Sequence, residues 1–192
     1  LGALCLLWSV FIGGFASAWT FLYPLPVDSM GLWSINTAAL FMVGYLLIGV
    51  GLLIFYLDAA AAIIRRYGNL GRALGLRWLF GGDIDPEHPK AVVASTMVII
   101  ANSLGVLAGA VVLVMCLINA YDPQVVLNAL VVKNLIYWFG HMIINATIYA
   151  SVIAVYELLP RYTRKPYGIS RPFLWSWSVS CLFVIIVFPH HL

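Results

Sequence analysis

The chain has 192 residues, of which 64% are hydrophobic and only 9% are charged, with a formal net charge of +3. A water-soluble domain is excluded, because no soluble chain of this length could cover so much apolar surface. The composition predicts an integral membrane protein. The first residue, Leu1, lies within an apolar run, and the last, Leu192, directly follows two histidines. We therefore expect an internal fragment of a longer protein.

Five apolar segments are long enough to cross a membrane as helices, which requires roughly 20 residues each. Every backbone polar group in hydrocarbon needs a partner within the protein, so these segments are expected to be helices. Pro24 follows the first segment, and Pro160 is expected to end the fourth. The predicted fold is an all-α membrane bundle, a single transmembrane domain over residues 1–192. Its spans are expected at about 1–23, 32–57, 91–119, 126–159 and 172–189.

The basic residues predict how the spans are oriented. Nine of the ten Lys and Arg residues lie between the second and third spans or between the fourth and fifth. The remaining connections, residues 24–31 and 120–125, carry only Asp28 and Asp122 as charged residues. The positive-inside rule places the basic segments in the cytoplasm and the other two connections outside. Residues 59–80, which mix Arg with Leu, Ile and Trp, either lie along the inner membrane surface or form an ordinary basic loop, the preferred interpretation.

Three of the four histidines, His141, His190 and His191, lie in or at the end of apolar runs. An imidazole in hydrocarbon is costly without a partner, so such residues are functional candidates. His141 lies 18 residues from the inner end of its span at Leu159, and His190 lies 18 residues from Pro172. Both are therefore roughly 27 Å above the cytoplasmic interface. Three imidazoles at one level are typical of a copper or zinc site, whereas a single one is more often a packing residue.

A polar stripe runs along the same helix as His141. With 100° per residue and His141 at zero, Asn145 lies at about 40°, Tyr156 at about 60° and Tyr149 at about 80°. The stripe leads from the level of His141 toward the cytoplasm. It can serve as a hydrogen-bonded path for proton uptake. Alternatively, these groups bond to a neighbouring helix, as polar transmembrane residues often do. The residues alone leave both interpretations open.

Two histidine motifs resemble those of subunit I of the heme–copper oxidases. One is W-x-G-H at Trp138–His141, and the other is P-H-H at Pro189–His191. Tyr23–Pro26 and Glu157–Pro160 are similar to segments of the B-type oxidases, and Phe188–His191 is similar to the Gly-Pro-His-His ending of the C-type oxidases. The resemblance covers the whole chain. It implies that the five spans are helices III to VII of a twelve-helix subunit.

The resemblance also implies cofactors and partners. His141, His190 and His191 would be the ligands of the copper ion called CuB, and a tyrosine matching Tyr156 belongs to the proton route of B-type oxidases. The low-spin and high-spin hemes of the family are bound by histidines outside this fragment, and His88, in a polar turn, is expected to be solvated. The implied partners are other oxidase subunits, including a subunit II-like protein for electron delivery, and cytochrome c or quinol. The implied location is the cell membrane of a prokaryote, with no nucleic-acid partner.

One position departs from the oxygen reductases of this family. Most of those enzymes place a tyrosine beside CuB one helical turn after the first histidine, where this chain has Asn145. In C-type enzymes the tyrosine lies six residues before the histidine pair, where this chain has Val184. NO reductases of the family lack the tyrosine, but many carry carboxylates near the metal, and none lies beside His141. Asn145 is the catalytic candidate, either bonding a metal-bound ligand or holding water for proton delivery.

Three functions follow from these residues. Reduction of O2 to water with proton uptake comes first, because most subunits with this pattern are oxidases. Reduction of NO is the alternative that the missing tyrosine favours. The third is a non-enzymatic membrane protein, such as a metal transporter, that uses the same histidines. The spans offer almost none of the carboxylates or methionines that a transport path normally shows.

Overall fold

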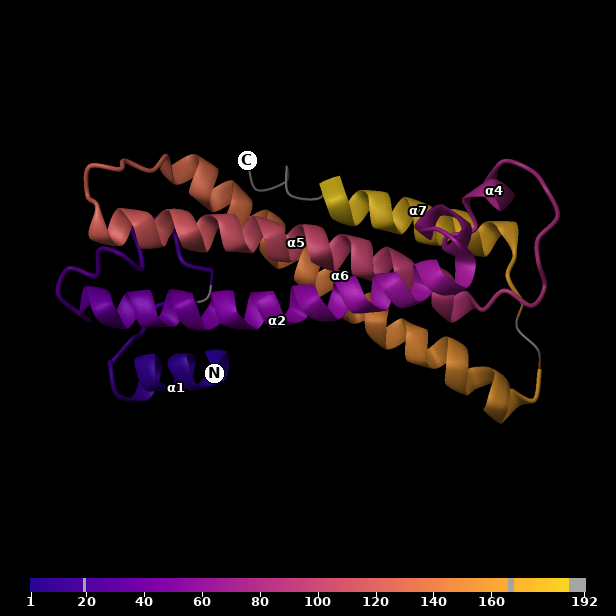
Figure 1. Cartoon of the computed structure of the whole chain (residues 1–192), viewed down its shortest axis with the longest axis horizontal. Helices are drawn as coiled ribbons and strands as arrows, with labels where there is room; N and C mark the ends of the chain where they lie inside the picture. Colours follow the sequence, from indigo (N-terminus) through magenta and orange to yellow (C-terminus); the bar gives the residue numbers. More distant parts are fainter. Residues whose placement is uncertain (19, 166–167, 187–192) are drawn as a thin grey trace. The chain divides into compact units, whose positions relative to one another are not determined.

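The computed structural model describes residues 1–18, 20–165 and 168–186. Within these ranges the secondary structure is helical, with turns and irregular connections and no strand. Three helices are long and apolar enough to cross a membrane, and two apolar helices are shorter. The predicted all-α membrane fold is confirmed. The helices (Figure 1) are α1 (Gly2–Phe11), α2 (Ile35–Tyr67), α3 (Leu70–Ala73), α4 (Leu76–Leu79), α5 (Lys90–Tyr121), α6 (Ala129–Thr163) and α7 (Arg171–Ile186).

The first predicted span differs most from the structure. The helix expected over residues 1–23 is confined to α1, which ends at Phe11. Gly13 and Gly14 follow, and Gly14 has a φ of +68°, a left-handed conformation that glycine adopts without strain and that interrupts a helix. With 10 residues, α1 is shorter than the roughly 20 residues needed to cross the hydrocarbon. The length of the apolar run suggested one continuous helix, but the two glycines within the run were not taken into account.

α2 is longer than the second predicted span. It continues to Tyr67, so residues 59–67 are helical and the connection begins only at Gly68, whose φ of +85° ends the helix. The connection then contains the short helices α3 and α4. Asn69 caps α3, because its side-chain oxygen accepts a hydrogen bond from the backbone N–H of Arg72 at 2.8 Å. The interpretation of this segment as an ordinary loop is therefore corrected to a helix end followed by two short helices.

α6 also runs past its predicted end. Pro160 lies inside the helix, which continues to Thr163. A proline removes one backbone N–H donor and therefore one hydrogen bond of the helix. Near the end of α6 this single loss does not stop the helix. The helix ends instead before Arg164, which has a left-handed φ of +52°. α7 follows the fifth predicted span as far as Ile186, and the expected end of that span near Pro189 lies outside the described residues.

The described chain forms two compact units. Unit 1 covers Leu1–Ile54 and Gly105–Gly140, and unit 2 covers Phe55–Leu104 and residues 141–186. α2, α5 and α6 each contribute one part to unit 1 and another part to unit 2. Both basic segments belong to unit 2, and so do the candidate side chains described below.

Unit 1 combines a close helix contact with a buried apolar cluster. α1 lies against α2 (Figure 1), and a Cβ atom built on Gly2 would lie only 2.6 Å from the carbonyl oxygen of Gly44. Glycine is therefore required for this approach. Tyr23 donates to the side-chain oxygen of Asn119 at 3.3 Å, and Asn119 donates to the carbonyl of Val125 at 2.8 Å. The buried cluster consists of Phe21, Met42, Val112, Cys116, Leu127, Val132 and Ile136.

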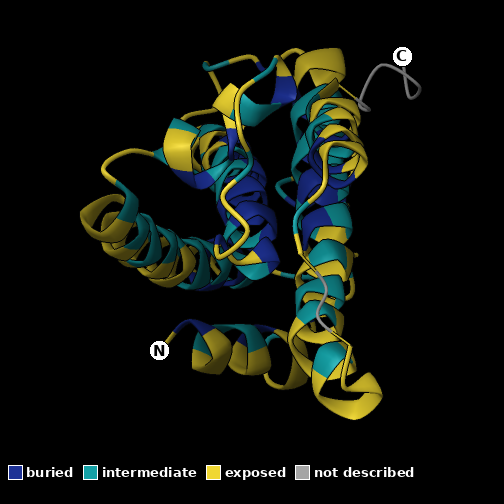
Figure 2. Cartoon of the chain, turned by 90° about the vertical axis from the view of Figure 1, so that its right-hand side faces the viewer, coloured by how far each residue is buried: buried dark blue, intermediate teal, exposed yellow. Residues whose placement is uncertain are grey.

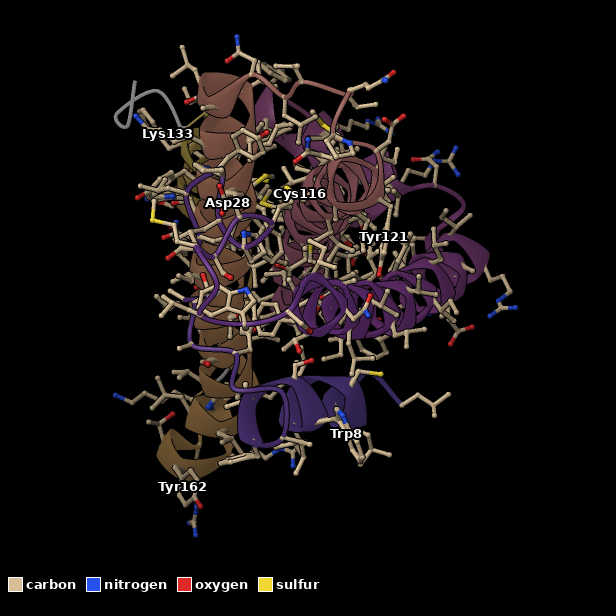
Figure 3. The ribbon with its side chains drawn as sticks, turned by 90° about the vertical axis from the view of Figure 1, so that its left-hand side faces the viewer. Trp8, Asp28, Cys116, Tyr121, Lys133 and Tyr162 are labelled. Carbon is tan, nitrogen blue, oxygen red and sulfur yellow. The ribbon has the colours of Figure 1, made fainter. Side chains whose placement is uncertain are left out.

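The outer faces of the long helices are exposed and apolar (Figure 2). Val50, Phe55 and Leu158 are at least half exposed. Trp8 and Tyr162 also point away from their helices (Figure 3). A large exposed apolar surface marks contact with lipid or with other protein segments. The exposed apolar side chains are therefore consistent with helices that lie within a membrane.

The predicted orientation can be tested by labelling cysteines from outside intact cells. Ser29 lies in a connection that the basic residues predict to be outside, but it is buried and its hydroxyl is bonded to the backbone, so it is a poor reporter. Its neighbour Met30 is 93% exposed, and Glu87, between α4 and α5, is also exposed. We expect a membrane-impermeant maleimide to modify Met30→Cys, and to modify Glu87→Cys only after the cells are opened. The parent protein with its native cysteines is the control, and labelling of Glu87→Cys in intact cells would reverse the orientation.

Candidate functional site

His141 lies on α6, where it is half-buried. Asn128 starts this helix by accepting hydrogen bonds from the backbone N–H groups of Leu130 and Val131, at 2.9 and 3.2 Å. One turn after His141, the side-chain Nδ2 of Asn145 donates to the carbonyl oxygen of His141 at 2.8 Å. The catalytic candidate Asn145 is thus bonded to its own helix, a local contact that polar side chains commonly make. This bond uses one of the two hydrogens on Nδ2.

The other two predicted metal ligands, His190 and His191, lie outside the described residues. Among the residues that the structure describes, no group of three or more His, Cys, Asp or Glu side chains is arranged to hold a metal ion. The three-histidine site therefore stays a prediction, and His141 is the one ligand of the set whose position is described.

His88 is the clearest correction among the titratable residues. Instead of being solvated, it is only 7% exposed. Its Nε2 lies 2.9 Å from the carbonyl oxygen of Ala73 in α3. Its ring meets the rings of Tyr67 and Trp78 edge to face, with centroids 4.9 and 5.0 Å apart. The polar neighbours of His88 in the sequence suggested solvation. The partners that bury it come from α2, α3 and α4, and the local sequence does not reveal them. His88 therefore packs the connection before α5 against these helices.

The polar stripe on α6 contacts α7 through Trp177. The indole Nε1 of Trp177 donates to the hydroxyl of Tyr156 at 3.0 Å. Tyr149, about two turns earlier on α6, meets the ring of Trp177 edge to face at 5.5 Å. Tyr156 thus bonds to a neighbouring helix, as the packing interpretation of the stripe expects. Its role in a proton route stays a prediction.

A small apolar cavity lies beside Tyr149 and is lined by residues of α5, α6 and α7. Its volume of about 10 Å³ is close to the space that one water molecule needs. Val184, at the position where a C-type oxidase would carry its tyrosine, is buried and lines this cavity together with Met97 and Cys181. Both expected tyrosine positions therefore hold side chains without a phenol, and the nearest stripe residue at the cavity is Tyr149.

Lys90 is a residue that sequence analysis missed, since it counts there only as one of the basic loop charges. It is the first residue of α5 and is 6% exposed. Its Nζ lies 4.8 Å from the ring centroid of Phe173 and 6.0 Å from that of Tyr156. Both rings also contact the ring of Trp177. Its place at the start of an apolar span was the one available signal, because its aromatic partners come from α6 and α7.

The long apolar helices with a half-buried histidine define a helical integral membrane protein. A model of the family described as cytochrome c and quinol oxidase polypeptide I matches the chain over residues 1–192. The chain therefore belongs to this family, subunit I of the heme–copper oxidases, as its histidine motifs predict. No curated protein and no solved structure matches the chain. Membership in the family implies a heme–copper oxidoreductase and favours it over a metal transporter.

The packing of His88 predicts a loss of stability when its ring is removed. His88→Ala deprives the carbonyl of Ala73 of its partner, which costs about 1–3 kcal/mol for a buried group. It also opens a void between the rings of Tyr67 and Trp78. We expect a lower Tm in detergent and faster tryptic cleavage within α3 and α4. Glu87→Ala, at an exposed neighbouring position, is the control. Equal behaviour of the two variants would show that His88 is solvated.

Proposed function

We propose that the chain forms part of the catalytic subunit of a respiratory heme–copper terminal oxidase, which reduces O2 to water with proton uptake. The family match over residues 1–192 carries this proposal. It is supported by His141, which is half-buried on α6 within the W-x-G-H motif. Cytochrome c or quinol would supply electrons through other oxidase subunits, a subunit II-like protein among them. The complex would lie in the cell membrane of a prokaryote.

The metal of this proposal is one copper ion, CuB, held by neutral imidazoles of His141, His190 and His191. His141 suits the role by its place on α6 within the W-x-G-H motif. A set of imidazole nitrogens is also a donor set that suits copper. Bound copper, together with low-spin and high-spin hemes held by residues outside this chain, would pass the electrons on to the gas and provide its binding position. The chain's own part is to hold the metal and to deliver protons along Asn145, Tyr149 and Tyr156.

The copper assignment predicts the outcome of three single substitutions in the purified holoenzyme. Loss of a residue that only supports a ligand already lowers metal affinity by about 10–100-fold. His141→Ala, His190→Ala and His191→Ala should therefore each strip the copper, measured as the copper-to-heme ratio. The low-spin heme spectrum should be retained. His88→Ala is the control histidine and should keep its copper. Full copper content in all three ligand variants would contradict the assignment.

Reduction of NO is the second candidate function, and Asn145 is the observation that favours it. An amide cannot deliver an electron and a proton as a phenol can. The Asn145 side chain also donates to the backbone of His141. Val184, the other tyrosine position, is buried beside an apolar cavity. Coupling two NO molecules needs fewer electrons than breaking the O–O bond, so it depends less on the missing tyrosine.

The relative rates with O2 and NO test this alternative. We expect appreciable NO reduction, and slower O–O cleavage than in tyrosine-bearing relatives, when purified holoenzyme receives the two gases in turn with the same electron donor. Asn145→Tyr should shift the rate ratio toward O2 by about ten-fold or more, since a positioned proton donor contributes at least that much. Asn145→Leu is the matched control and should not shift it toward O2. Fast, complete reduction of O2 with no detectable NO turnover would contradict the expected role of Asn145.

A further inference from the structure

Lys90 stands apart from the other charged side chains of the chain. Among the Lys, Arg, Asp and Glu residues that the structure describes, it is the one that is buried. An ammonium group removed from water loses its hydration, which is costly unless other groups replace the water. Additional protein packed around it can only deepen this burial. A basic residue needed merely for orientation would remain in water, as Arg65, Arg72 and Arg161 do.

The surroundings of Lys90 compensate part of this cost. Its Nζ faces the ring of Phe173 at 4.8 Å, and the ring of Tyr156 lies at 6.0 Å. A cation within about 6 Å of an aromatic ring is attracted by the electron-rich face of the ring, more strongly when the pair is out of water. Pro89, the preceding residue, is exposed, so Lys90 lies at the boundary between solvent and the aromatic cluster. The amine is therefore placed between an aqueous side and the stripe on α6.

Tyr156 links this boundary to the rest of the stripe. A phenol hydroxyl has one donor and two acceptor positions, and the bond from Trp177 uses one acceptor position. Tyr149 lies seven residues earlier on α6, which corresponds to roughly 10 Å along the helix axis. Tyr149 and Trp177 both line the small cavity between α5, α6 and α7. Asn145 lies on α6 one turn before Tyr149 and one turn after His141.

The geometry points to Lys90 as the proton-loading residue at the inner end of this stripe, an inference that rests on the proposed gas-reducing function. The ammonium of Lys90 releases one proton toward Tyr156, directly or through one water molecule. The Tyr156 hydroxyl accepts this proton and passes its own proton onward, so it remains a neutral phenol. The neutral amine then takes one proton from water on the basic side. One proton moves inward in each cycle, both side chains are restored, and no electrons are transferred at these residues.

Arginine separates this role from a purely structural one. A cation that only packs against aromatic rings can be replaced by arginine, which stacks on rings at least as well. Arginine stays protonated at all relevant pH values and cannot release its proton to a neighbour. Lys90→Arg therefore keeps the charge and removes the proton transfer, whereas Lys90→Met removes both. Lys133→Met, which alters the half-buried lysine of unit 1, is the matched control.

The experiment uses purified holoenzyme, supplied with O2 and then with NO, and with ascorbate and a small redox mediator as electron donor. We expect turnover in Lys90→Met and Lys90→Arg to fall by about ten-fold or more, with copper and heme contents unchanged. Lys133→Met should retain normal turnover. Methylamine added to Lys90→Ala should restore part of the rate, because a small amine can occupy the vacated space and carry protons. This rescue also carries the test where Lys90→Met fails to assemble.

Three outcomes would overturn the role of Lys90. Normal turnover in Lys90→Met would show that protons bypass it, and normal turnover in Lys90→Arg would show that only its positive charge is needed. Failure of methylamine to accelerate an assembled but slow Lys90→Ala would count equally against proton transfer. These results differ from failure of the proposed function itself. In that case the unaltered holoenzyme, loaded with copper and heme, would reduce neither gas.

Discussion

A polar group within an apolar helix bundle must find its partner inside the protein, because lipid offers none. The described chain meets this constraint in two ways. Ser9, Thr96 and Asn145 turn back and donate to the carbonyl four residues earlier on their own helix, at 2.7 to 2.8 Å. Tyr23 and Trp177 instead donate across to another part of the fold, at 3.3 and 3.0 Å. The first solution leaves neighbouring helices independent, and the second ties them together.

This distinction divides the polar stripe on α6. One N–H of the Asn145 side chain is bonded within α6, so this bond does not couple the level of His141 to another helix. Tyr156 and Tyr149 are coupled to α7 by Trp177, through a hydrogen bond and a ring contact. Tyr149 and Tyr156 are therefore held in place by contacts with α7, while Asn145 is held by a bond to the backbone of its own helix. A substitution in α7 should disturb Tyr156 more directly than Asn145.

Features carried by single apolar runs could be predicted from the sequence, and features assembled from several segments could not. The long helices α2, α5 and α6 follow from uninterrupted apolar residues, and the family follows from the two histidine motifs, one of which includes His141. The early end of α1 was missed, because Gly14 acts through its backbone conformation and hardly changes the hydropathy. His88 is expected in solvent because its neighbours in the sequence are polar, and Lys90 counts only as one of the basic loop charges. Their burial depends on side chains from other helices, which spacing along one segment cannot reveal.

The contact between α1 and α2 makes Cys5 sensitive to the spacing of these helices. A Cβ atom on Gly44 would lie 3.1 Å from the Cβ of Cys5 and 3.0 Å from the carbonyl oxygen of Gly2, so the surfaces touch where both glycines lack a side chain. Cys5 is half-buried and is not in a disulfide. Any change that widens the gap, whether a bulkier residue or a wedged lipid chain, would raise its rate of alkylation. The alkylation rate of the native Cys5 thus reports on the separation of α1 and α2, without an added probe.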